Sequence, residues 1–421
     1  MTSTTALQPQ GQTLRRRTTE IVWWAIVAQL FVLASVLGSL ASLIVLILAL
    51  LLSLLIDKPS WLEGSRQPLG YIFVTAFLVM AASFVATARE PYDAINTFNF
   101  IPMLLAVAIY AMAREKGGER LLRIIATLCL VGAVAAMVIG AFEVFLLDKH
   151  RAGAMFNNEI VYGRTGLLLG FLALIGFLLG GKHRLWFLIG PIAGACVLVL
   201  SGTRGGMVAL PIILLIALTA VFVATGRSRR VAIFGLGGLV VVSMLVVSLQ
   251  AMTNGRLDVL FDVVSAILTG EGTVDNSTAY RLEMYAAGIA AFLERPLWGY
   301  GWANLTAAAA EHMAPDRFRV VLGNQNHLHN DLLNFAVAAG LPGIACFLAF
   351  LGAPLVQLVR QYRKSTNGLI MAYAVTLIVA TYAITGLFDM TLGYDISTTF
   401  YAFALAIILG ATARTEPPSA L

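Results

Sequence analysis

The chain has 421 residues, of which 59% are hydrophobic and 12% are charged, and its mean hydropathy is +0.86. Soluble globular proteins carry about 25% charged residues, so this composition excludes a water-soluble domain. Cys129, Cys196 and Cys346 all lie inside apolar runs, which argues against a disulfide framework and indicates small buried side chains.

Apolar runs long enough to cross about 30 Å of hydrocarbon recur along the chain, and they must be helical because lipid cannot satisfy backbone polar groups. The first run is about 36 residues long, too long for a signal-peptide core, and predicts a retained hairpin that turns near Gly38. The fold class is therefore an all-α polytopic membrane protein. About twelve spans are expected, at 20–37, 39–56, 69–87, 97–113, 121–146, 164–181, 185–201, 206–225, 231–250, 332–358, 368–387 and 396–413.

These spans divide the chain into five predicted segments. They are a cytoplasmic tail at 1–19, spans one to nine at 20–250, an outward helical loop at 251–331, spans ten to twelve at 332–413, and a cytoplasmic tail at 414–421. Both tails are expected to be disordered. Within the loop, Ser277-Thr278 can cap a helix that ends before Pro296, and a second helix is expected from Trp302 to Met313.

Basic residues are distributed unevenly between the two sides of the predicted bundle. With a cytoplasmic N-terminus, 18 of the 28 lysines and arginines fall in predicted cytoplasmic segments, as the positive-inside rule requires. The net charge of +6 therefore indicates anionic membrane lipid as the partner and not nucleic acid. The remaining ten, which include Arg164, Arg204 and Arg281, lie outside and need another explanation.

The segment Ser201-Gly-Thr-Arg204-Gly-Gly206 forms an outward turn before a span expected to begin at about Gly206. Free N–H groups at a helix start, beside a guanidinium group, suit a phosphate. A tight turn with an interfacial arginine fits the spacing equally well. Arg281 is expected in the first turn of the loop helix without an acidic residue at i+3 or i+4, so it indicates an external anion, a solvated side chain, or a pair with Asp275.

Polar residues gather at the outer end of the tenth span. His329 is flanked by Asn330 and could accept a proton from a sugar hydroxyl, with His327 as the rival base. Asp389 could orient the histidine or pair with an arginine. Each of these groups could instead be an interfacial polar residue. The other histidines lack metal-ligand spacing, so no metal site is expected. Arg164 is expected to contact the acceptor or an anion.

Three sequence blocks, in this order, resemble the O-antigen ligase and polymerase superfamily, and the length and loop position are most similar to the O-antigen ligases. The blocks are Ser-Gly-Thr-Arg204-Gly-Gly, Arg281 followed by Arg295-Pro-Leu-Trp-Gly-Tyr-Gly301, and His329-Asn-Asp-Leu-Leu-Asn with Gly340-Leu-Pro-Gly343. Thr203 stands where the family usually has serine, and Asp389 matches the pattern only loosely.

The resemblance implies a metal-independent, cofactor-free inverting glycosyltransferase of lipopolysaccharide biosynthesis. It would move a glycan from undecaprenyl diphosphate to lipid A–core oligosaccharide at the periplasmic face of the bacterial inner membrane. Arg204 and Arg281 would hold the diphosphate, and His329 would activate the acceptor hydroxyl. An O-antigen polymerase or a protein O-oligosaccharyltransferase would share this donor and these motifs. A lipid-linked oligosaccharide transporter is disfavoured, because the predicted span centres contain almost no ionisable residues and no internal repeat is evident.

Overall fold

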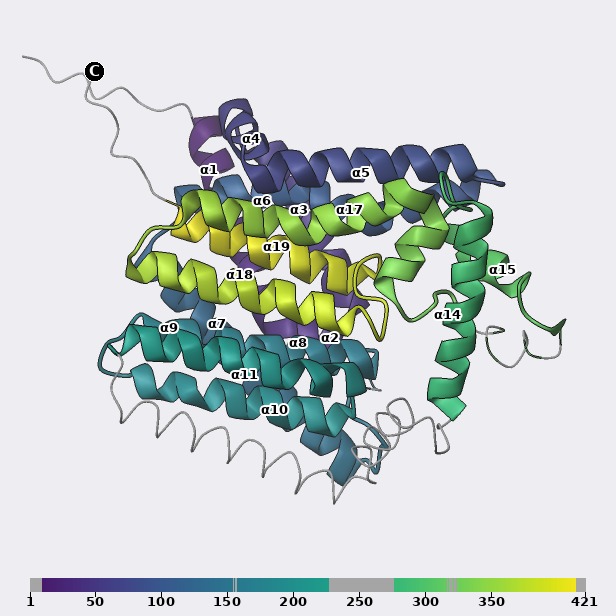
Figure 1. Ribbon diagram of the computed structural model, residues 1–421. Helices are drawn as coiled ribbons and strands as arrows, with labels where there is room; N and C mark the ends of the chain where they lie inside the picture. Colours follow the sequence, from purple (N-terminus) through teal and green to yellow (C-terminus); the bar gives the residue numbers. More distant parts are fainter. Residues whose placement is uncertain are drawn as a thin grey trace, which may run out of the picture.

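The structure is a computed structural model that describes residues 10–153, 155, 157–226, 276–315, 317, 321, 323 and 325–413. Every regular element in these ranges is helical, and most long helices run side by side in one bundle (Figure 1). Ten of the described helices are long and apolar enough to cross a membrane, or up to eleven if Ser39–Leu55 and Lys58–Ser65 form one bent span. The chain is therefore an all-α polytopic membrane protein.

The N-terminal part of the bundle comprises α1 (Gln10–Ala28), η1 (Gln29–Leu33), α2 (Ala34–Leu37), α3 (Ser39–Leu55), α4 (Lys58–Ser65), α5 (Pro68–Thr87), η2 (Pro91–Phe100), α6 (Ile101–Glu115), α7 (Glu119–Ala141) and η3 (Phe142–Leu146). The middle part comprises α8 (Glu159–Leu172), α9 (Leu174–Leu178), η4 (Arg184–Leu188), α10 (Ile189–Ser201) and α11 (Arg204–Ala224). The C-terminal part comprises α14 (Asn276–Glu294), η5 (Trp302–Asn304), α15 (Leu305–Ala310), α17 (Asp331–Gln361), α18 (Thr366–Thr385) and α19 (Asp395–Thr412).

Eleven of the twelve predicted spans coincide with these helices, whereas the ninth, at 231–250, lies outside the described residues. The predicted disordered tail at 1–19 needs correction, because the chain is helical from Gln10 onward. Arg15 explains the difference, since its Nε and Nη2 donate to the carbonyls of Leu55 and Ile56 at 2.9 and 3.3 Å and tie α1 to the end of α3.

The two most enclosed spans are those of α8 and α19, each about nine-tenths buried in its most apolar window (89%). Glycine permits the close approach of α8 to α10 and to the turn that follows it. A Cβ at Gly170 would lie 2.4 Å from the Gly190 carbonyl oxygen, and one at Gly163 would lie 2.1 Å from Ser201 Oγ. Small residues at such contacts allow helices in lipid to pack closely. This packing sets the position of Arg164, one residue after Gly163, against the 201–204 turn.

The span predicted at 332–358 is helical but bent. Gly340 has φ +65° and ψ −147° within α17, a backbone conformation that favours glycine. Pro342 follows and has no N–H to donate, while Leu341 N donates to Pro296 O at 2.7 Å instead of to its own helix. The bend therefore leaves two carbonyls of α17 without helical donors.

The segment between α14 and η5 supplies the missing donors. Tyr300 N donates to Val337 O at 3.0 Å, and Gly301 N donates to Ala338 O at 2.8 Å. The backbones are so close that a Cβ at Gly299 would lie 2.6 Å from the Ala338 carbonyl carbon. The motif block at 295–301 is thus hydrogen-bonded to the bend that precedes and includes the block at 340–343, which indicates a structural role for both blocks.

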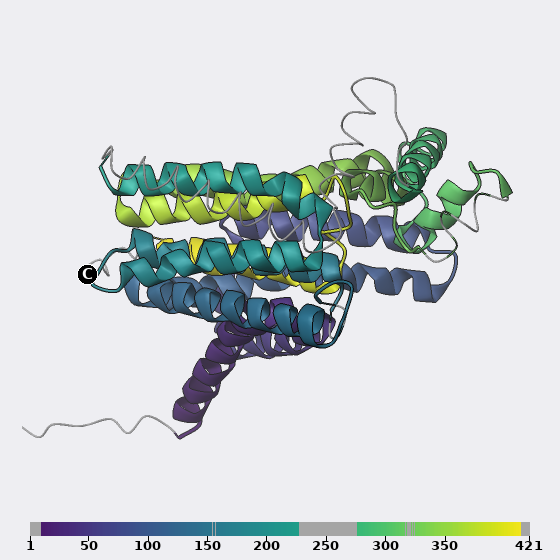
Figure 2. The same cartoon turned by 90° about the horizontal axis from the view of Figure 1, so that it is seen from below.

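Helix α14 lies across one end of the bundle, roughly at right angles to the spans, as Figures 1 and 2 both show. It packs on α15 and on the start of α17 through Met284, Ala287 and Ala291, which are buried. Its observed bounds agree with the expected loop helix, whereas the second expected helix, Trp302 to Met313, is divided into η5 and the shorter α15. The crosswise orientation brings Arg281 over the ends of α8, α11 and α18.

Candidate active site

Five charged side chains from separate segments line one cavity of about 230 Å³ at this end of the bundle. Arg164 comes from α8, Arg204 is the first residue of α11, Arg281 comes from α14, and Arg151 precedes α8. Asp389, in the loop between α18 and α19, is the carboxylate among the lining residues. The cavity therefore carries a surplus of positive charge and is suited to an anion.

The segment from Ser201 to Arg204 forms the expected tight turn. Gly202 has φ +63°, and Ser201 Oγ shares a hydrogen bond of 2.8 Å with Thr203 Oγ1. The helix begins at Arg204, two residues before the expected Gly206, with Thr203 as its N-cap, and Thr203, Arg204 and Gly205 line the cavity. Backbone N–H groups at a helix start favour negative charge.

Arg164 is fully buried, with 0% of its surface exposed. Its Nη2 donates to Ser397 Oγ, and its guanidinium carbon lies 5.3 Å from the centre of the Tyr382 ring. Its Nε and Nη1 have no hydrogen-bond partner within the described part of the chain. A buried guanidinium group with unused donors is costly unless a ligand supplies acceptors.

Arg281 lies in the second turn of α14, not in the first, because the helix already begins at Asn276. Glu283 pairs with Arg317 and not with Arg281, with Arg317 Nε at 3.1 Å from Glu283 Oε2. Glu283 is thus not available to neutralise Arg281.

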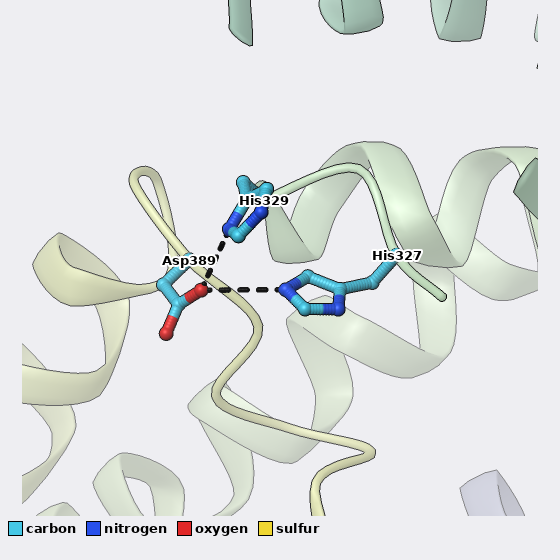
Figure 3. Close-up of side chains that lie close together, drawn as sticks. All are labelled: His327, His329 and Asp389. Atoms are coloured by element: carbon cyan, nitrogen blue, oxygen red, sulfur yellow. Dashed lines mark hydrogen bonds and ion pairs between the residues drawn. The ribbon is translucent and has the colours of Figure 1, made fainter. Parts of the chain in front are cut away.

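His329 and Asp389 form the most direct polar contact of the candidate site (Figure 3). His329 Nδ1 lies 2.9 Å from Asp389 Oδ1, which fixes one edge of the imidazole ring. The backbone of His329 has φ +52°, an unusual conformation for a residue other than glycine. Tyr285 of α14 supports this conformation by donating its hydroxyl to His329 O at 2.9 Å and to Leu387 O at 3.2 Å.

The surroundings of the pair favour a neutral His329 imidazole beside an ionised Asp389 carboxylate. Burial lowers the pKa of His329 below its usual value, although the hydrogen bond to Asp389 acts in the opposite direction. Burial alone would raise the pKa of Asp389, but hydrogen bonds from His327 and His329 outweigh it and hold that pKa below the usual range. A neutral imidazole oriented by a carboxylate is able to accept a proton.

Sequence reasoning assigned no role to Asp331. Its side chain links the loop that carries His329 to the loop that carries Asp389. Its buried carboxylate accepts from Thr391 N at 2.8 Å, from Leu392 N at 3.2 Å and from Thr391 Oγ1. Asn330, predicted as a supporting residue, caps α17 by accepting from Leu333 N at 3.0 Å and donates to a loop carbonyl. These contacts of Asn330 and Asp331 hold His329 and Asp389 in position relative to each other.

His327 lies beside the pair, as Figure 3 shows, and its ring centre is 4.2 Å from that of His329. Its Nε2 lies 3.4 Å from the same Asp389 oxygen, a longer contact than that of His329. One ligand atom from each of His327, His329 and Asp389 lies within 4.8 Å of the others, so the three could hold a metal ion. Sequence spacing did not indicate this cluster, because Asp389 is some sixty residues distant (|i−j| = 60) and only the fold brings it near.

Fold and site together define a multi-pass membrane protein with a cationic cavity and a histidine–aspartate pair at one end of the bundle. Residues 189–348 match the O-antigen ligase family. An O-antigen ligase of Escherichia coli (strain K12) is 26% identical over 310 residues, covering 72% of this chain and 70% of that relative. These findings support placing the chain in the O-antigen ligase superfamily.

Proposed function

We propose that this protein is an inverting O-antigen ligase. It transfers a glycan from undecaprenyl diphosphate to a hydroxyl of lipid A–core oligosaccharide at the periplasmic face of the bacterial inner membrane, with both termini in the cytoplasm. The observation that carries the proposal is the position of Asp389, which lines the arginine cavity and also binds His329 Nδ1 at 2.9 Å. The Asp389 carboxylate therefore places the proposed base, His329, next to the proposed anion site.

The reaction requires two changes at the anomeric carbon of the donor. The bond from this carbon to the diphosphate oxygen breaks, and a bond to the acceptor oxygen forms on the opposite face. His329 takes the proton of the acceptor hydroxyl at Nε2, while Asp389 holds the Nδ1–H. General-base catalysis of this kind contributes about 10²–10⁴-fold to the rate.

The leaving diphosphate gains negative charge as the glycosidic bond breaks. Arg204 and Arg281 line the cavity where this charge would develop, and the N-terminus of α11, which also lines it, favours negative charge. Arg164 Nε and Nη1, which have no hydrogen-bond partner within the described part of the chain, are two further donors for the leaving group. Positive charge fixed in advance can replace the divalent metal that other phosphate chemistry uses, which supports a metal-independent reaction.

Two related enzymes, an O-antigen polymerase and a protein O-oligosaccharyltransferase, would use the same donor and the same charged groups. The match to a curated O-antigen ligase over most of the chain favours the ligase. A transporter of lipid-linked oligosaccharide is less favoured, because transport gives no reason to hold His329 in a strained backbone conformation against Asp389.

The test combines purified protein in liposomes with undecaprenyl-diphosphate-linked glycan and lipid A–core oligosaccharide, in EDTA. We expect glycan to appear on lipid A–core, and His329→Ala to lower the rate by about 10²–10⁴-fold. Arg281→Ala should lower it by about 10²–10³-fold, as for the loss of other donors that stabilise developing negative charge.

A matched control is His312→Ala, since His312 pairs with Glu294 at 3.2 Å and does not line the cavity. This variant should ligate normally. Glycan chains that lengthen on the lipid carrier would instead identify a polymerase. Normal ligation by His329→Ala would remove His329 as the base.

A further inference from the structure

Three side chains, those of Asp389, Asn326 and Gln325, contact the ring nitrogens of His327 and His329. The inner nitrogens, His327 Nε2 and His329 Nδ1, face the same oxygen of Asp389 at 3.4 and 2.9 Å. The outer nitrogens face amides, with His327 Nδ1 at 2.6 Å from Asn326 Oδ1 and His329 Nε2 at 3.1 Å from Gln325 Oε1. All four ring nitrogens therefore have an oxygen partner.

A neutral imidazole has only one N–H, so two neutral rings cannot donate to all four oxygens at once. If the two N–H groups bind the amide oxygens, the inner lone pairs both point at the carboxylate and need a cation between them. If the N–H groups bind Asp389, the amides must turn to present their NH₂ groups. The same residues thus serve either a metal-bound or a proton-bound state.

Distances and ligand types fit a transition metal. Tetrahedral Zn²⁺, with bonds of about 2.0–2.1 Å, places its ligand atoms about 3.4 Å apart. The contacts of the two rings with Asp389 Oδ1, at 2.9 and 3.4 Å, are close to this value, and all three atoms lie within 4.8 Å. Ligating histidines normally donate their second N–H to a carbonyl or carboxylate oxygen, which Asn326 and Gln325 offer.

We propose that His327, His329 and Asp389 form a binding site for Zn²⁺ or a similar transition metal, and that the bound metal inhibits the enzyme. Binding occupies His329 Nδ1 and leaves the proton on Nε2, so the ring can no longer accept one from a hydroxyl. The fourth coordination position remains for water. The binding site stands on geometry alone, whereas the inhibition rests on the proposed function.

The test is isothermal titration of Zn²⁺ into the full chain, freed of metal with EDTA that is then removed, and purified with a tag that lacks histidine. We expect one site per chain that His327→Gln weakens by more than about 100-fold, since loss of an outer partner alone costs about 10–100-fold. Gln325→Ala should fall in that smaller range. Mg²⁺ should not bind, because it prefers oxygen ligands.

The matched control is His312→Gln, the same substitution at a half-buried histidine outside the cluster. It should change Zn²⁺ affinity by less than about twofold. Equal affinities of His327→Gln and His312→Gln, or no binding to the unaltered protein, would overturn the site.

Ligation assays separate this inference from the proposed function. Zn²⁺ should reduce the rate of the unaltered enzyme at the concentrations at which it binds, and EDTA should restore that rate. Activity in EDTA that Zn²⁺ does not reduce would overturn the inhibition and leave the ligase proposal intact. No activity in EDTA would count against the metal-independent ligase, while the titration would still decide whether the site exists.

Discussion

His329 occupies a backbone conformation that costs on the order of 1–3 kcal/mol for a residue other than glycine, with φ +52°. Hydrogen bonds from Tyr285 to the carbonyls of His329 and Leu387 stabilise it, together with the Asp331 contacts that hold the opposite loop. Strain retained in this way directs the imidazole toward Asp389. At the scale of single residues, the proposed chemistry thus depends on Asp389 holding Nδ1 of His329 while Nε2 is left to react.

Asp389→Asn tests this orientation. An asparagine can present its NH₂ group to His329 Nδ1, which favours the tautomer with a proton on Nε2 and removes the base. We expect kcat to fall by at least about 10²-fold while KM for the donor changes little. Steady-state ligation kinetics at varied donor concentration give both constants. A raised KM with unchanged kcat would instead assign Asp389 to donor binding.

Arg164→Met tests whether the unused donors of Arg164 await a ligand. The unliganded protein should unfold at the same or a higher temperature, because an incompletely paired buried charge is replaced by an apolar side chain of similar length. The thermal stabilisation given by inorganic pyrophosphate should become smaller. Scanning fluorimetry in detergent measures both effects. A large loss of stability without pyrophosphate, with full stabilisation by it, would show that Arg164 is purely structural.

At the scale of elements, the bend of α17 and the segment before η5 form one unit. The chain at Gly340 and the chain at Gly299 approach within van der Waals contact, and exchange of backbone hydrogen bonds replaces those lost at Pro342. This unit sets the direction of the part of α17 that precedes the bend, and therefore where His329 lies relative to α14. The glycine-containing motif blocks act on the site through backbone geometry.

Gly340→Ala should be strongly destabilising. The new Cβ would lie 2.5 Å from Pro296 O, and the residue would have to keep φ +65°. Gly352→Ala in the same helix is the matched control, since its Cβ would meet nothing within 4 Å. The control should be neutral or more stable by up to about 1 kcal/mol. Thermal unfolding in detergent compares the two, and similar melting temperatures would contradict the argument.

At the scale of the whole molecule, the charge distribution predicts which end of the bundle faces the cytoplasm. Leu387 is 48% exposed beside Asp389, and the side chain of Glu115, near the opposite end, is 65% exposed. In a variant without the three native cysteines, an impermeant maleimide applied to intact cells should label Leu387→Cys. It should label Glu115→Cys only after the inner membrane is permeabilised. The reverse pattern would invert the topology.

Sequence reasoning identified the spans well, because a run of apolar residues needs no distant partner to indicate a membrane helix. It also predicted that Arg204, Arg281 and His329 lie on the same side of the membrane, and the structure has them at one end of the bundle. It placed the start of α11 two residues late and put Arg281 in the first turn of α14, because caps depend on local backbone geometry that composition does not encode. His327 was named without its contacts to Asp389 and Asn326.

The sequence by itself determined that this is a helical membrane protein, where its polar segments lie between the spans, and which motif blocks resemble those of a family. Hydrophobicity, charge asymmetry and local motifs are properties of short segments, so they can be read without a fold. Only the tertiary structure decided that Asp389 meets His329, that four arginines share one cavity, and that Asp331 joins two loops. These contacts link residues far apart in the chain, and the packing of glycine-lined helices sets their distances.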